Sequence, residues 1–407
     1  MRIGSTLAVF AVLSVLLAAC ASDSASVSPS SSPPTAAPSA IASGGASAAA
    51  SAGPTSELVI GVVTDVATDN EKESNEAIVV GTQQGAVAIG ADPPPVVIPT
   101  STDLYAPLIQ AMVEQDFDVI VTTGVDLIPA TVAAAKANPN TWFIGVDQAP
   151  CLDDKGAHDP TGKQCTGDGS TLLPRYIATS YAEDQAGYLA GMVAASATKS
   201  KIIGAIGGVS LCGPCVRFMQ GYVLGARSVD PTIKVKTAFL SPTDYTLGFA
   251  DQAAGAAFTS EFLEKNARID VLFQAAGLTG AGSLTGKGII DAGCAAGIKV
   301  IGVDVDQHQT YPDSQRCILT SAEKHLSSSV TDTMVGISTG TAKGGRALFD
   351  ASNGGIGISP FYDAAGVLPA DIQARVDGAI SRMKAGSLVT CPPAPACGMT
   401  PAPRIGD

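Results

Sequence analysis

Aromatic and positively charged side chains are both scarce in this chain. Of its 407 residues only 5% are aromatic, and 24 Lys and Arg stand against 37 Asp and Glu, which gives a formal net charge of −13. No basic stretch offsets that charge, so the composition argues against binding to nucleic acid. After the first twenty residues no apolar run approaches the length of a membrane span, and we expect the rest of the chain to be soluble.

Motifs of several enzyme classes are missing as well. The sequence contains no Walker phosphate loop. Its three histidines, His158, His308 and His325, lack the spacing of a metal site. We therefore expect neither a metal nor a cofactor.

The N-terminus has the features of an export signal. Arg2 is followed by an apolar segment from Leu7 to Leu17, and Leu17-Ala-Ala-Cys20 is a lipobox. Residues 1–20 are therefore predicted to be a lipoprotein signal peptide, with Cys20 diacylated; the alternative is an ordinary secretory signal with a chance cysteine. Residues 21–56 are almost entirely Ser, Ala, Pro, Thr and Gly. They predict a disordered tether of roughly 30–36 Å root-mean-square length, which holds the folded body at the outer face of the cell membrane.

Eight cysteines remain besides Cys20. An even number in an exported chain favours disulfides over metal sites, although eight cysteines allow about 105 pairings. Local spacing suggests the pairs Cys151–Cys165, Cys212–Cys215, Cys294–Cys317 and Cys391–Cys397. Cys212-Gly-Pro-Cys215 also has the spacing of a thioredoxin redox pair. It lies in mid-chain after a Gly-Gly turn, so we interpret it as a structural bridge at a helix start.

One phrase occurs twice in the chain. Residues 142–148 read Trp-Phe-Ile-Gly-Val-Asp-Gln, and residues 299–307 read Lys-Val-Ile-Gly-Val-Asp-Val-Asp-Gln. Each is a short β-branched run that suits a strand buried on both faces of a parallel sheet. Asp147 and Asp304 would then stand at the carboxyl ends of two strands, which is where ligands bind in open α/β sheets. The repeat predicts two similar lobes with a ligand between them.

Strands and helices alternate along the rest of the chain. A strand over 57–65 ends at Asp65, an acidic loop covers 69–75, and a helix is expected over 76–90. Near the C-terminus we expect a strand over 316–321 and a helix over 322–340. Short connections between alternating strands and helices imply doubly wound parallel sheets.

Several stretches, in their order and spacing, resemble the basic membrane protein family. These proteins are substrate-binding lipoproteins of ABC transporters, and the purine nucleoside receptor lipoproteins are among them. The most specific stretches are 270–280, 300–307 and 319–324, and the similarity extends from about residue 57 to 392. The resemblance implies a type I periplasmic-binding-protein fold with two α/β lobes, a three-segment hinge and a ligand cleft. It implies a first lobe of 57–180 plus 308–340, a second of 181–307 plus 341–390, and a C-terminal tail of 391–407.

The resemblance also implies a set of ligand-binding residues. They are Asp65, Asn75, Asp147, Gly277, Asp304 and Lys324. Asn75 matches the asparagine of the family's Ser-Phe-Asn loop, but the phenylalanine of that loop, which stacks on a base, is Ser74 here. Tyr245 is the nearest candidate for an aromatic partner from the other lobe. The departure at Ser74 leaves open whether the ligand is a purine nucleoside.

The predicted function is that of a lipid-anchored receptor and not of an enzyme. The protein would be a monomer that captures a small polar ligand, nucleoside-like or otherwise hydroxylated, and delivers it to an ABC transporter permease. One alternative is a sensor lipoprotein that signals to a membrane receptor. Another is a hydrolase that uses the carboxylates of Asp147 and Asp304.

Overall fold

The computed structural model describes residues 56–66, 72–277 and 283–407. The predicted signal peptide with Cys20, the predicted tether up to residue 55 and part of the predicted acidic loop lie outside these residues. Within the described part, no helix is both long enough and apolar enough to cross a membrane.

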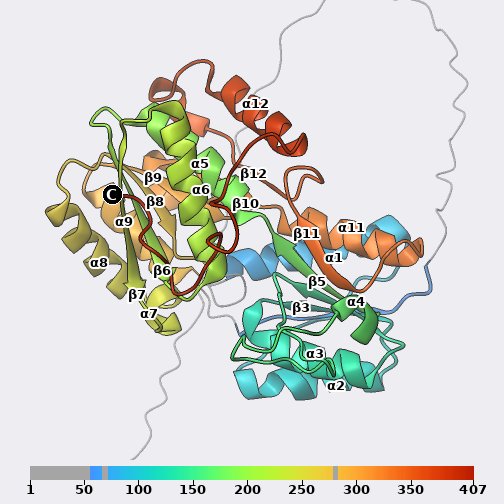
Figure 1. Cartoon of the computed structure of the whole chain (residues 1–407). Coiled ribbons are helices and arrows are strands. Elements are labelled where there is room, and N and C mark those ends of the chain that lie inside the picture. Colours follow the sequence, from blue (N-terminus) through green and yellow to red (C-terminus); the bar gives the residue numbers. More distant parts are fainter. Residues whose placement is uncertain (1–55, 67–71, 278–282) are drawn as a thin grey trace, which may run out of the picture. The chain divides into compact units, whose positions relative to one another are not determined.

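The described chain forms two six-stranded sheets (Figure 1). The first sheet has the strand order β11-β5-β4-β3-β1-β2, and every pair in it is parallel. Its strands are β1 (Ile60–Val63), β2 (Val96–Val97), β3 (Val119–Thr123), β4 (Trp142–Val146), β5 (Tyr176–Tyr181) and β11 (Gly345–Phe349). All residues of β1, β3 and β5 are buried, as expected for strands covered on both faces.

The second sheet repeats this plan. Its order is β12-β10-β9-β8-β6-β7, and only β12 runs antiparallel to its neighbour. Its strands are β6 (Ile202–Val209), β7 (Lys234–Ser241), β8 (Val271–Ala275), β9 (Lys299–Asp304), β10 (Ile318–Lys324) and β12 (Ile356–Ile358). We call the units built on the first and second sheets the first and second lobes.

Helices connect the strands and cover the sheets (Figure 1). They are α1 (Lys72–Ile89), α2 (Tyr105–Glu114), α3 (Ile128–Ala137), α4 (Gly169–Leu172), α5 (Glu183–Ala197), α6 (Gly213–Val229), α7 (Tyr245–Phe249), α8 (Gln252–Lys265), α9 (Leu284–Ala295), α10 (Gln307–Thr310), α11 (Leu326–Ser338) and α12 (Ile372–Lys384). Helices α5 and α6 pack closely: a Cβ at Gly187 or Gly191 would stand only 2.2 or 2.0 Å from a carbonyl oxygen of α6. These two glycines recur four apart on one helix face, which lets the two helix backbones approach each other.

The chain passes between the two sheets three times. It leaves the first sheet after β5 and returns to it at β11, after β10 of the second sheet. The third passage leads from β11 to β12. Two parallel-sheet lobes joined by three crossing segments confirm the predicted type I periplasmic-binding-protein fold.

The predicted division of the C-terminal segments between the lobes is wrong for two strands. β10 was expected in the first lobe but pairs with β9, and β11 was expected in the second lobe but pairs with β5. The chain turns back through α10 after β9, and the disulfide Cys294–Cys317 ties the start of β10 to α9 of the second lobe. The crossing therefore comes one strand later than predicted.

Two predicted element boundaries also differ. Helix α1 begins at Lys72 and not at residue 76, so Asn75 lies in a helix and not in a loop; the acidic Glu73 in the first turn suits the positive end of a helix dipole. Strand β10 continues to Lys324, beyond the predicted end at Ser321, because Ala322 and Lys324 pair with β12.

All four predicted disulfide pairs are present. The bridge Cys391–Cys397 lies in the C-terminal tail, which packs on the second lobe. The Gln220 side chain of α6 donates to Ala396 O (2.8 Å) and accepts from Gly398 N–H (2.9 Å). The predicted tail is therefore an ordered part of the second lobe.

Candidate functional site

The two copies of the repeated phrase share an unusual backbone geometry. Asp147 directly after β4 has φ 57°, and Asp304 at the end of β9 has φ 67°. This left-handed region is unfavourable for a residue with a side chain, by roughly 1–3 kcal/mol, and such residues cluster at functional sites. Aspartate tolerates the region better than most residues. The turn recurs at matching strand ends, so the two carboxylates are presented in the same way by the two lobes.

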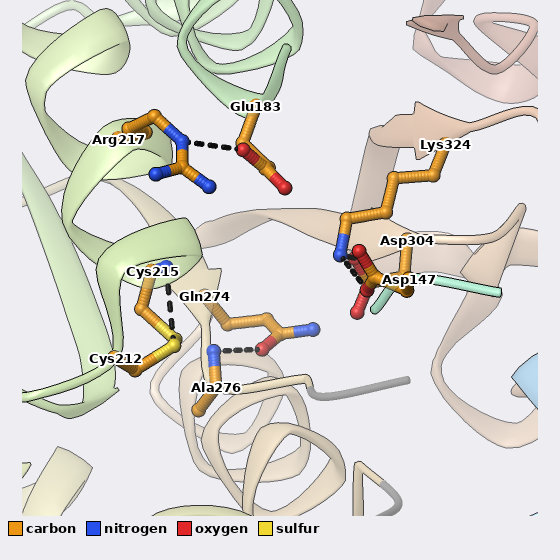
Figure 2. Close-up of a disulfide and its surroundings, with 9 residues drawn as sticks. All are labelled: Asp147, Glu183, Cys212, Cys215, Arg217, Gln274, Ala276, Asp304 and Lys324. Carbon is orange, nitrogen blue, oxygen red and sulfur yellow. Dashed lines mark hydrogen bonds and ion pairs between the residues drawn. A yellow bond between two sulfur atoms is a disulfide. The ribbon is translucent and has the colours of Figure 1, made fainter. Parts of the chain in front are cut away.

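A lysine joins these two aspartates (Figure 2). Lys324 Nζ, at the end of β10, lies 2.7 Å from Asp147 Oδ2 and 3.2 Å from Asp304 Oδ1. All three side chains are at most 5% exposed. Asp147 belongs to the first lobe and the other two to the second, so the cluster bridges the lobes. Three of the predicted site residues thus meet at one place.

The charged groups of this cluster differ in their pKa shifts and in their hydrogen bonds. Burial lowers the pKa of Lys324, but the carboxylates of Asp147, Asp304 and Glu183 outweigh it and raise that pKa above its ordinary value. The lysine therefore stays cationic. Burial raises the pKa of Asp304, and the nearby Asp147 adds to this rise. Lys324 hydrogen-bonds to Asp147, whereas Asp304 accepts no hydrogen bond of ordinary geometry from the described residues. The Asp304 carboxylate can therefore accept further hydrogen bonds.

A second ion pair stands beside the first (Figure 2). Arg217 Nε of α6 lies 2.6 Å from Glu183 Oε2 at the start of α5, and the Glu183 side chain is 1% exposed. Burial raises the pKa of Glu183, although Arg217 and Lys324 lower it. This pair was not predicted from the sequence, because the two residues come from separate helices. The acidic first turn of α5 marks Glu183 but not its partner.

Gly277 serves the site through its missing side chain. A Cβ at this position would stand 2.6 Å from Asp304 Oδ2 and 2.8 Å from Val303 Cγ1. Glycine is therefore needed for the Asp304 carboxylate to occupy its place, and this gives a physical role to a residue predicted from resemblance alone.

Asp65 and Asn75 form a separate polar cluster in the first lobe. Thr123 Oγ1, at the end of β3, accepts from Asp65 N–H (2.7 Å) and donates to Asn75 Oδ1 (2.7 Å). The hydroxyl of Tyr105 donates to the Asp65 carboxylate. Asn75 Nδ2 is buried with no hydrogen-bond partner among the described residues. Asp65 lies just after β1, and Asn75 of α1 contacts Thr123 at the carboxyl end of β3, at the same sheet edge as Asp147.

The aromatic side chains that could stack on a ligand differ in their exposure. The rings of Tyr181 and Phe218 lie 5.9 and 5.7 Å from Lys324 Nζ, but both are buried. Tyr245 of α7 is 45% exposed, and its ring centroid lies 5.6 Å from that of Phe249. Ser74 is partly buried in the first turn of α1. Among these rings, only Tyr245 is exposed enough to stack on a ligand.

The Cys212–Cys215 disulfide lies at the start of α6 (Figure 2). Cys212 Sγ caps the helix by accepting from Cys215 N–H (3.2 Å), and the two residues are 4% and 2% exposed. Redox-active cysteines are partly accessible, so this burial supports the interpretation as a structural bridge. Among the described residues, no group of three or more His, Cys, Asp or Glu is placed to hold a metal ion.

Comparison with known proteins gives matches over most of the chain. The family described as ABC transporter substrate-binding protein PnrA-like matches residues 97–374. The ABC transporter nucleoside-binding protein BmpA of Lactococcus lactis subsp. cremoris (strain MG1363) is 29% identical over 283 residues, which cover 66% of this chain and 72% of that protein. Basic membrane protein A1 of Borrelia garinii subsp. bavariensis (strain ATCC BAA-2496 / DSM 23469 / PBi) is 23% identical over 320 residues, or 78% and 83% of the two chains.

Solved structures show the same fold. A solute-binding protein of an ABC transporter system from Aeropyrum pernix K1 superposes with a TM-score of 0.60 at 19% identity, over 84% of this chain and 95% of that one. A second, from Conexibacter woesei DSM 14684, has a TM-score of 0.59 at 21% identity, over 82% and 98%. At these identities the likeness concerns the fold alone.

Proposed function

Because the chain belongs to the family of PnrA-like ABC transporter substrate-binding proteins, we propose that it is a lipid-anchored receptor that captures a small hydroxylated solute between its lobes and delivers it to a transporter permease. The observation that carries the proposal is the cluster of Asp147, Lys324 and Asp304. It joins the carboxyl ends of strands from both sheets, where a bound ligand can contact both lobes at once.

The chemistry of the cluster favours a neutral ligand with several hydroxyl groups. Ionised carboxylates accept strong hydrogen bonds from hydroxyls, and Asp304 has the acceptor capacity for them. Asn75 Nδ2 supplies a buried donor at the same edge of the first lobe. A ribose or another polyol brings both donors and acceptors. The relative named as a nucleoside-binding protein supports a nucleoside-like ligand.

The serine at position 74 argues for a weaker contribution from the base. A stacked aromatic ring is worth about 1–3 kcal/mol per base. With Ser74 in that place, the hydroxyl contacts of Asp304 would account for most of the affinity, and Tyr245 remains the candidate ring from the second lobe.

The location follows from the N-terminal residues. The lipobox at Cys20 and the Ser/Ala/Pro tether support a receptor held at the outer face of the cell membrane, with the permease as its partner. Incorporation of a palmitate analogue into the expressed protein tests the anchor: Cys20→Ser should abolish labelling, and labelling that persists would contradict it.

The ligand can be identified directly. Gently purified protein should release a small hydroxylated molecule on denaturation, which mass spectrometry can identify. In titration calorimetry the same molecule should bind the protein again in a one-to-one ratio, and it should remain unaltered. Turnover of the molecule by the purified protein would contradict the receptor role and favour a hydrolase.

A further inference from the structure

The Glu73 side chain makes a hydrogen bond across the lobes. Glu73 stands in the first turn of α1 in the first lobe, next to Ser74. Its Oε2 accepts a hydrogen bond from Gln307 Nε2 of α10 in the second lobe, at 3.5 Å. The contact lies close to the ligand site, because Gln307 follows Asp304 by three residues.

The second lobe fixes the direction of this hydrogen bond. Gln307 is fully buried, and its Oε1 accepts from Val303 N–H (3.0 Å) and from Gln274 Nε2 (2.7 Å). A backbone N–H can only donate, so the amide orientation is determined and Nε2 must point away from Val303. The acceptor that it meets is Glu73. A buried N–H without an acceptor is unfavourable, so Gln307 favours the arrangement in which Glu73 reaches it.

The surroundings of the Glu73 carboxylate come mainly from the second lobe. Burial raises the pKa of Glu73; hydrogen bonds from Tyr311, Gln307 and Thr310 lower it, and the charge of Asp304 raises it again. Tyr311 is itself held by Ser283 Oγ at 3.0 Å. Glu73 therefore meets a preformed set of donors on the opposite lobe.

We propose that Glu73 is a positioning residue that latches the two lobes together beside the ligand site through its hydrogen bond with Gln307. This rests on the proposed function, since a latch between the lobes affects a ligand only if the ligand binds between them. The latch is a direct contact between the lobes, in addition to the contacts that the ligand makes with each lobe. It therefore stabilises the arrangement in which the lobes enclose the ligand.

The latch makes closure depend on pH. With the lobes together, burial holds the pKa of Glu73 above its ordinary value; with the lobes apart, water would return the pKa toward that value. The latched state therefore binds a proton more tightly, and latching strengthens as the pH falls through the raised pKa. Glu73→Gln keeps an acceptor oxygen without a charge. Its latch should be at least as strong at pH 7 and should lack this pH dependence.

The experiment compares the full chain with Glu73→Gln, Glu73→Ala and the control Glu76→Ala, which changes an exposed glutamate of the same helix. X-ray scattering gives the radius of gyration, and hydrogen exchange follows the amides of residues 307–311. In Glu73→Ala we expect a larger radius of gyration, faster exchange, and a Kd for the probe adenosine raised about fivefold or more. The affinity of Glu73→Gln relative to the wild type should be higher at pH 7 than at pH 5.

The readouts separate the latch from the ligand. If Glu73→Ala equals Glu76→Ala in scattering and in exchange, the latch is wrong. If the wild type does not bind adenosine, adenosine is not a ligand of this site, and scattering and exchange decide on the latch.

Discussion

The two copies of the Gly-Val-Asp phrase share sequence and backbone but not chemistry. In the first copy, Gln148 is satisfied inside its own lobe: it donates to Thr122 Oγ1 and Gly124 O and accepts from Tyr176 OH. In the second, the amide of Gln307 donates across to Glu73. The aspartates differ in the same sense, because Lys324 hydrogen-bonds to Asp147 and only forms an ion pair with Asp304.

This difference shows that neighbours decide what a repeated motif does. In the first copy the Gln148 amide is satisfied inside its own lobe, and Asp147 accepts a hydrogen bond from Lys324 of the second lobe. In the second copy Asp304 can accept further hydrogen bonds, and the Gln307 amide donates to Glu73 of the first lobe. We therefore expect the first copy to matter more for stability and the second more for ligand recognition.

The largest effect is expected from removing the shared lysine. Lys324→Met leaves two buried carboxylates without a counter-charge, which should destabilise the fold by about 3–5 kcal/mol. Denaturant unfolding measures this against Lys199→Met, an exposed control. The triple change Asp147→Asn, Lys324→Met and Asp304→Asn should recover most of the loss. A Lys324→Met protein as stable as the control would show that the cluster is not a coupled ionic unit.

Separate truncation of the two aspartates tests the asymmetry itself. Asp304→Ala should remove measurable ligand binding, a loss of about 2–5 kcal/mol, while the protein stays folded. Asp147→Ala should lower the unfolding midpoint more than Asp304→Ala does, because it removes the direct hydrogen bond of Lys324. Calorimetry with the co-purified ligand measures the loss of affinity, and thermal unfolding measures the loss of stability. Equal effects of the two variants in both assays would show that the two aspartates do not differ in role.

A smaller effect is expected at the position of the missing ring. Ser74→Phe should raise the affinity for purine nucleosides by about 1–3 kcal/mol through stacking, whereas Ser74→Ala should change little. Titration with adenosine and guanosine measures both. Tight binding of either nucleoside by the unchanged protein would mean that another aromatic, such as Tyr245, already stacks on the base.

The smallest effect is expected from the N-terminal tether. A chain that starts at Ser56 lacks only residues too poor in apolar surface to pack. It should fold and bind ligand with an unchanged Kd. Weaker binding by this shortened protein would mean that the tether contacts the lobes.

Sequence patterns were sufficient where the determinants are local. The strand-end aspartates, the disulfide pairs and the alternating sheets follow from short runs of residues, and all are present. Long-range pairing was harder. Which sheet β10 and β11 join depends on the strand with which each one pairs. The Arg217–Glu183 ion pair depends on how helices α5 and α6 pack. Glu73 was placed in a loop, and its partner lies 234 residues away.

If the second copy of the phrase recognises the ligand between the lobes, a crystal structure of the protein with its co-purified ligand should show this contact. We expect ligand hydroxyl groups within hydrogen-bond distance of the Asp304 carboxylate, with Lys324 still joining Asp304 to Asp147. A ligand bound elsewhere, with Asp304 in contact only with Lys324, would contradict it.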